Sequence, residues 1–150
     1  MSTTAYEIMD AIRTAMASSY PTKSELANRV DLESNTDHIL KNGYDVIVGA
    51  ATNEGELRGR GISTSRDMAI VLTKSFIESD LKNDIKQSTE ETLFQEIVNI
   101  CSLLKTDSTI GGKVLDLEID GDSGIEVLNA DKLKILTSTI NFTIRYVEIY

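Results

Sequence analysis

Hydrophobic residues recur at helical spacing in two segments of the chain. The first segment comprises Ala5, Ile8, Met9, Ile12, Ala15 and Met16. The second comprises Leu93, Phe94, Ile97, Val98, Ile100, Cys101 and Leu104. Thr4 with Glu7, and Ser88 with Glu91, form capping-box patterns just ahead of these segments. We therefore predict two amphipathic helices, the second of which ends before Asp107.

Four further segments carry strand patterns. Residues 44–51 are rich in β-forming residues, and residues 68–76 alternate, with Lys74 as the one charged residue on their apolar face. Residues 113–121 alternate apolar with acidic side chains, which places Leu115, Leu117 and Ile119 on one face. A long final strand is predicted from residue 133 to residue 150. Residues 22–42 remain unassigned, since a short helix or an irregular loop fits them equally well.

The order of these elements predicts an α+β fold. A mostly antiparallel β-sheet with the two main α-helices packed on one face satisfies this order with short connections. The 150 residues suit a single domain, 1–150, with an adequate core.

Residues 53–65, between the first two predicted strands, contain three glycines and few apolar residues. We expect an exposed, flexible loop that contacts a partner. Its candidate interface residues are Glu54, Glu56, Leu57, Arg58, Arg60 and Ile62. The two arginines suit carboxylates on a partner. A nucleotide site is disfavoured, because the segment lacks both the third glycine of a dinucleotide fingerprint and the Gly-Lys-Ser/Thr of a P-loop.

The chain has a formal net charge of −9, which argues against binding nucleic acid by phosphate neutralisation. Segments 113–122 and 78–91 supply much of the negative charge. The candidate acidic surface residues are Asp116, Glu118, Asp120 and Asp122. Three of them match the first, third and fifth positions of an EF-hand loop, but Val127 stands where the bidentate glutamate is required. We therefore expect a solvated strand face and no metal site.

The remaining candidate groups give no catalytic constellation. His38 is the only histidine and lies in a polar run, so a surface position is favoured. Cys101 is the only cysteine, which excludes an intrachain disulfide, and it lies on a helical apolar stripe. We expect no enzyme activity and no cofactor. The sequence has no apolar run long enough for a membrane span and begins without a signal-peptide pattern, which predicts an intracellular protein.

Taken together, the pattern resembles a known family. The segments that carry the resemblance are 6–12, 43–48, 65–72, 109–114 and 139–146, with the glycine-rich loop and the long helix between them. They are similar to the tail terminator proteins of long-tailed bacteriophages, also called tail completion or tail-to-head joining proteins.

The resemblance implies a structural virion protein of the tail and neck, which is present in the host cytoplasm during assembly. Such proteins form a hexameric ring that caps the tail tube, ends tube polymerisation and joins the tail to the head connector. The implied partners are other copies of the chain, the tail tube protein and a head-completion or connector protein. Genome DNA passes through the ring without sequence-specific binding, and the candidate residues facing the lumen are Asp116, Glu118, Asp120 and Asp122. No membrane is involved. Two alternatives stay open: another neck or tail assembly protein (a head-completion stopper, a connector adaptor or a tube subunit), and a small-ligand-binding regulatory domain.

Overall fold

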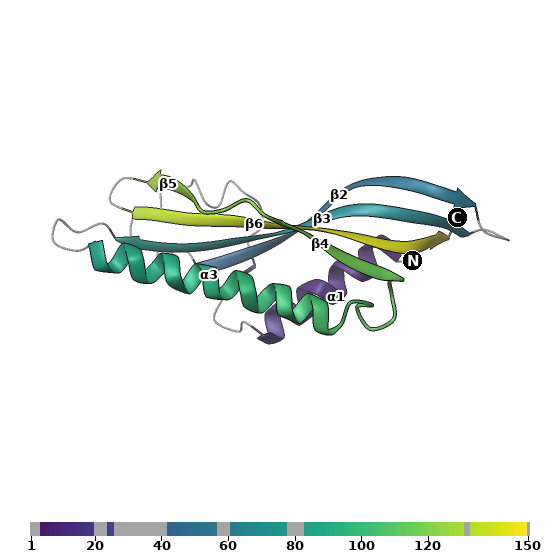
Figure 1. Ribbon diagram of the computed structural model, residues 1–150, viewed down its shortest axis with the longest axis horizontal. Helices are drawn as coiled ribbons and strands as arrows, with labels where there is room; N and C mark the ends of the chain where they lie inside the picture. The colour runs from purple at the N-terminus through teal and green to yellow at the C-terminus, as the bar shows by residue number, and fades with distance from the viewer. Residues whose placement is uncertain are drawn as a thin grey trace.

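The computed structural model describes residues 4–19, 24–25, 42–56, 61–77, 83–130 and 133–149. Its elements are α1 (Thr4–Ser19), β1 (Ser24–Glu25), β2 (Asn42–Glu56), β3 (Gly61–Ile77), α3 (Asn83–Thr106), β4 (Asp116–Asp122), β5 (Glu126–Ala130) and β6 (Leu133–Ile149). One sheet has the order β1-β2-β3-β6-β4, and β5 also pairs with β6. Among the described strands, only the short β1–β2 pairing is parallel. Both helices lie on the same face of the sheet, so the predicted α+β fold is confirmed (Figure 1).

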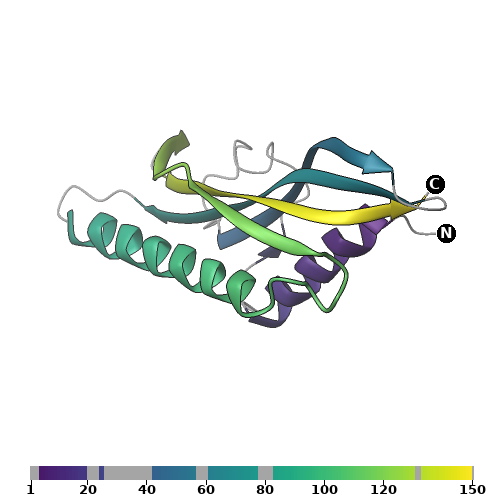
Figure 2. The same cartoon turned by 45° about the vertical axis from the view of Figure 1, so that its right-hand side comes forward.

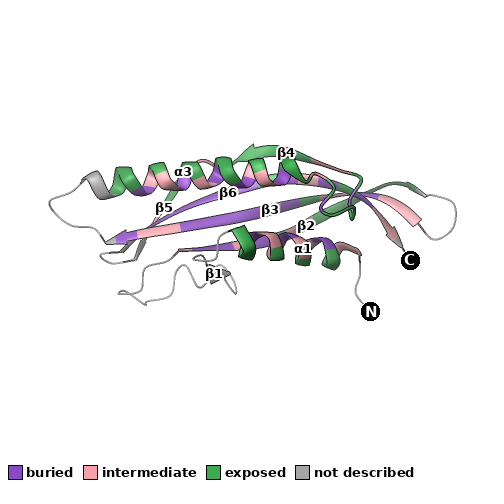
Figure 3. Cartoon of the chain, turned by 90° about the horizontal axis from the view of Figure 1, so that it is seen from below, coloured by how far each residue is buried: buried purple, intermediate pink, exposed green. Residues whose placement is uncertain are grey.

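The centre of the sheet is the antiparallel pair β3–β6, which stays in register from Gly61 opposite Ile149 to Ile77 opposite Leu133. Side chains that point from this pair toward the helices are apolar and buried, among them Ile70, Leu72, Leu136, Ile140, Phe142, Ile144 and Tyr146. Burial of this kind stabilises a fold by roughly 25 cal/mol for each Å² of apolar surface removed from water. The purple strand segments in Figure 3 mark this buried layer.

Most residues of the two predicted helical stripes form the other half of the core, whereas Phe94 and Val98 of the second stripe are exposed. From α1 the buried residues are Ile8, Ile12 and Met16, and from α3 they are Leu93, Ile97, Ile100 and Leu104. The start of α3 is a correction, because the helix begins at Asn83 and Ser88 lies inside it rather than capping it. The Ser88 carbonyl accepts a hydrogen bond from the Thr92 hydroxyl at 2.9 Å. The end of α3 at Thr106 agrees with the prediction.

Lys74, the charged residue on the apolar face of β3, is accommodated by a partner on α3. Its Nζ atom lies 3.5 Å from Oε1 of Glu96, and both side chains are largely buried. Pairing offsets the cost of taking both charges out of water. The ion pair therefore lets a lysine occupy the layer between sheet and helix.

Two short strands were absent from the sequence-based prediction. In the unassigned segment 22–42, Ser24–Glu25 forms β1, which pairs with Gly43 and Tyr44 of β2. Residues 126–130, between the last two predicted strands, form β5, which pairs with β6. β1 is only two residues long and takes its hydrogen bonds from a segment 19 residues away, so local periodicity does not reveal it. β5 is different, because it pairs with the neighbouring start of β6, Ala130 opposite Leu133, and this local pairing was missed.

Candidate partner interface at the sheet edges

The segment predicted as a flexible loop, 53–65, is mostly strand, and this part of the prediction is wrong. β2 continues to Glu56, and β3 starts at Gly61, with Asn53 opposite Thr64 and Glu56 opposite Ile62. The strands extend this far because β3 has two partners: β2 pairs with one edge of β3, and β6 pairs with the other edge down to Gly61. Glu54 is exposed and Ile62 is half-buried. Leu57, Arg58 and Arg60 lie outside the described residues.

A bulge bends β2 midway along the hairpin. The register with β3 shifts between Val48 and Ala51, and again between Asn53 and Gly55. The Arg66 guanidinium holds the first bulge, donating to the Gly49 carbonyl oxygen at 2.8 Å and to the Tyr146 hydroxyl at 2.9 Å. Gly49 packs so closely on β3 that an added Cβ would lie 2.8 Å from the Asp67 carbonyl oxygen. The bend is thus fixed by packing and by hydrogen bonds across three strands.

The four acidic candidate residues divide between the two faces of the sheet. Asp116 and Glu118 lie opposite Arg145 and Thr143, on what we call the outer face, the face away from α1 and α3. Asp120 joins them, because its Oδ2 atom accepts a hydrogen bond from the Thr143 hydroxyl at 2.8 Å.

Asp122 is a correction, because it lies opposite Ile140, whose side chain is in the core. A register shift between Ile119 and Gly121 adds one residue to β4 and reverses the facing of the residues after it. Leu115 is a second correction. It precedes the strand, follows the 107–114 turn and is 64% exposed, whereas the alternation had placed it with the half-buried Leu117 and Ile119.

Arg145 is the centre of charge on the outer face. Its guanidinium donates two hydrogen bonds to the Asp116 carboxylate, one of them from Nε at 3.0 Å. These bonds lower the pKa of Asp116 below its ordinary value. Glu54 and Glu118 also act on Arg145 electrostatically, and together with Asp116 they raise its pKa. Three carboxylates around one guanidinium leave this part of the outer face negative.

Asp122 borders a shallow groove between β4 and α3. The other lining residues are Ile97, Val98, Cys101, Ser102, Lys105 and Thr106. Burial raises the pKa of the Cys101 thiol, and the negative charge of Asp122 raises it further, while Lys105 acts in the opposite direction. Cys101 is therefore a protonated, half-buried thiol that packs against the core, as its position on the apolar stripe predicted.

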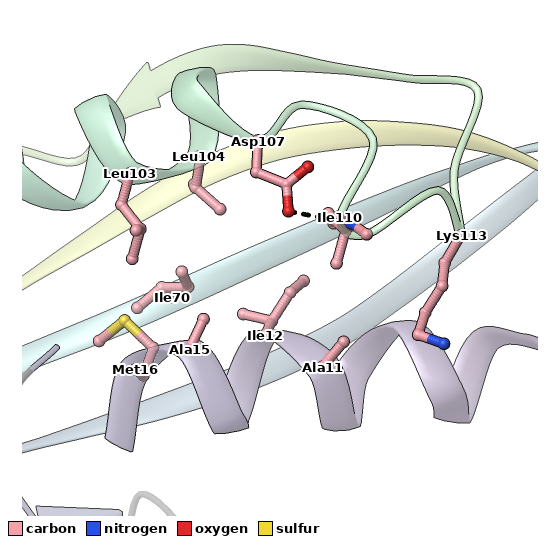
Figure 4. Close-up of a pocket in the computed structure, with 11 residues that line it drawn as sticks. Ala11, Ile12, Ala15, Met16, Ile70, Leu103, Leu104, Asp107, Ile110 and Lys113 are labelled. Carbon is pink, nitrogen blue, oxygen red and sulfur yellow. Dashed lines mark hydrogen bonds between the residues drawn. The ribbon is translucent and has the colours of Figure 1, made fainter. Parts of the chain in front are cut away.

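An apolar cavity of about 250 Å³ separates α1 from the end of α3 (Figure 4). Ala11, Ala15 and Met16 line it from α1, with Leu103 and Ile110 opposite. The polar residues at the cavity are Asp107 and Lys113. The Asp107 carboxylate already accepts hydrogen bonds from the Gly111 amide at 2.9 Å and from the Thr109 hydroxyl at 3.2 Å. The cavity thus offers an apolar molecule volume but few unused polar partners.

Other candidate groups do not converge on a site. His38 lies outside the described residues. Within the described ranges, no group of three or more His, Cys, Asp or Glu side chains has an arrangement that could hold a metal ion. Likewise, no described helix is long and apolar enough to cross a membrane.

Comparison of the sequence with protein-family models and with curated proteins found no match. Among the described residues, Asp116, Glu118 and Asp120 gather on the outer face at the sheet edge formed by β4. In Figure 2, β4 is the outermost strand at one edge, beside β6.

Proposed function

We propose that this chain is a structural subunit of a phage tail, forming a ring that caps the tail tube, ends its polymerisation and joins the tail to the head connector. The observation that carries the proposal is the acidic outer face beside an edge strand. Asp116, Glu118 and Asp120 lie there on a sheet whose other face is covered by helices. A ring needs surfaces on two flanks of each subunit, and a sheet with strands at two edges supplies them.

Negative charge on the outer face also suits a channel for DNA. Carboxylates repel phosphates over about a Debye length, ~8 Å at physiological ionic strength, so a negatively charged lining disfavours sticking. In this proposal Asp116, Glu118 and Asp120 line the channel. Asp122 does not, because the bulge directs it toward the groove beside α3.

The test is to add the purified protein to polymerising tail tube subunits and to examine the products by electron microscopy. We expect tubes that are shorter than in its absence and capped at one end. Copolymerisation along the tube would identify a tube subunit instead. A protein that binds the connector but ignores tube ends would identify a stopper or an adaptor.

Residues 53–65 are the proposed contact with the tube or with a neighbouring subunit. Deleting residues 55–61 should abolish capping, and capping that survives the deletion would refute this assignment. Because the deletion removes paired residues from both strands, a charge reversal at Arg58 and Arg60 is the matched variant. It alters the predicted carboxylate-binding groups and keeps the chain length unchanged.

The cavity between α1 and α3 favours a second candidate function, a small-ligand-binding regulatory domain. Its lining is apolar, so the ligand would be a small apolar molecule. Such a ligand, bound only by the folded state, would raise the melting temperature in a manner that depends on its concentration. Screening apolar compounds by thermal shift, with Ala15→Phe to fill the cavity as control, would detect it.

A further inference from the structure

The two edges of the sheet are related in strand direction. One edge is β4; at the other, β1 lies beside Gly43 and Tyr44, and from Val46 onward β2 is the outermost of the described strands. β2 and β6 both run antiparallel to β3, so they are parallel to each other. β4 runs antiparallel to β6 and therefore antiparallel to β2. If a second copy is placed beside the first in the same orientation, its β2 meets β4 of the first copy as an antiparallel neighbour. The alternation of strand directions then continues unbroken from copy to copy.

We propose that β4 of one copy pairs with residues 46–56 of β2 in the next copy, beyond the stretch that β1 occupies, so that the sheet runs through the junction between subunits. This inference rests on the proposed ring and names the surfaces that join its members. Such a junction uses two different flanks of each subunit, and head-to-tail contacts of this kind close into rings. Backbone hydrogen bonds supply affinity when a strand is added to an edge.

Apolar side chains on the helix side of both edge strands support the pairing. Leu117 and Ile119 on β4, and Val48 on β2, pack against the core but remain partly exposed. Opposed across a new strand pair, apolar side chains of this kind stabilise the pairing of the strands. The junction would therefore cover apolar surface that the single subunit leaves accessible to water.

The helices offer a second contact between neighbouring copies, on the same two flanks as the edge strands. On α3, Phe94 is 50% and Val98 is 60% exposed, and Val98 lines the groove beside Asp122 of β4. Phe94 and Val98 thus lie on the side of the subunit where β4 forms the edge. α1 packs against β2, so the next copy would bring its α1 toward these two residues.

Charge on the outer face opposes the same junction. Each copy carries a formal net charge of −9, and the junction would bring Asp116, Glu118 and Asp120 of one copy against the next copy. Exposed like charges repel less as salt shortens the Debye length from about 10 Å at 0.1 M to about 3 Å at 1 M. The junction should therefore form more readily at high salt, and single subunits should resist association at low salt.

Paired cysteines provide the test, because Cys101 is the only native cysteine. In a Cys101→Ser background, Ile47→Cys and Glu118→Cys place one thiol on each edge strand, both on the outer face. Ile47 is 42% exposed and Glu118 is exposed, so both positions tolerate change. A short bis-maleimide should convert the double variant into a ladder of dimers, trimers and larger species on a denaturing gel.

Single-cysteine variants are the first control, since each can form at most a dimer. An equimolar mixture of the two should give mainly the mixed dimer. The second control replaces Ile47→Cys by Asn99→Cys, an exposed position on α3, and should give no ladder. Raising NaCl from 0.05 to 0.5 M should increase the yield of cross-linked species several-fold, because salt screens the repulsion between the copies.

Three results would overturn the inference: no ladder at either salt concentration, efficient Glu118→Cys homodimers that indicate β4–β4 pairing, or cross-linking of β4 only to tube subunits. A ladder that weakens with salt would contradict the opposition of like charges and hence the pairing. This test is separable from that of the proposed function. A ladder from a protein that ignores tube ends would refute only the capping role, and capping without a ladder would refute only this junction.

Discussion

The centre of the sheet and its β4 edge belong to one structure but are held by different interactions. Ile70, Ile140 and Phe142 of β3 and β6 are fully buried under the helices. β4 is held by two half-buried apolar residues, Leu117 and Ile119, and by the exposed Asp116–Arg145 ion pair to β6. Apolar burial responds little to pH or salt, whereas exposed charge pairs respond to both. The molecule therefore combines a core that responds little to pH and salt with an edge strand whose attachment depends on both.

The largest expected effect comes from removing a core side chain. Phe142→Ala should lower the free energy of unfolding by about 3–5 kcal/mol, the usual cost of deleting a buried aromatic ring. Leu115→Ala is the control, because Leu115 is exposed and precedes β4. It should change the stability by less than about 0.5 kcal/mol in urea denaturation. Equal losses for the two variants would contradict the assigned core.

An intermediate effect is expected at the bulge of β2. Gly49→Ala would place a Cβ against the Asp67 backbone, and overpacking of this kind costs about 1–3 kcal/mol. Ala50→Ser, at an exposed neighbour, is the control and should be nearly neutral. Thermal unfolding measures both. A neutral Gly49→Ala would show that β2 does not approach β3 as closely as described.

The smallest effect is a pH dependence confined to the β4 edge. The pKa of Asp116 is lowered in the folded state, so its contribution to stability is complete above the ordinary value of 3.8 and is lost as pH falls through the lower folded-state value. Protection of β4 amides from hydrogen exchange, relative to β3, should therefore decline only below about that pH. In Asp116→Asn, the remaining decline should be weaker. If the decline of β4 protection at acid pH is the same in Asp116→Asn as in the unchanged protein, carboxylates other than Asp116 cause it.

Local patterns predicted the helices well and the strands incompletely. The stripes of α1 and α3 follow from helical spacing, because each buries one face against the sheet. The first turns of α3 carry no such stripe, and they include an exposed Lys86–Glu90 pair four residues apart. Pairs of this type support a helix by only a few tenths of a kcal/mol, so the sequence placed the start too late, at Ser88.

The acidic candidate site shows why the rest was not predictable. Alternation placed Asp116, Glu118, Asp120 and Asp122 together, but one extra residue at the bulge separated Asp122 from the others. Likewise, the extension of β2 and β3 through residues 53–56 and 61–65 depends on β6, more than 70 residues away in the chain. Such long-range pairings leave little signal in a single sequence.

Averaged electron micrographs of tail tube ends that carry this protein test the central proposal most directly. We predict a closed, hexameric ring at the tube end, with the outer face of β4 turned toward the channel so that Asp116, Glu118 and Asp120 line it. An end without a ring, or a ring that presents these carboxylates on its outside, would contradict the account.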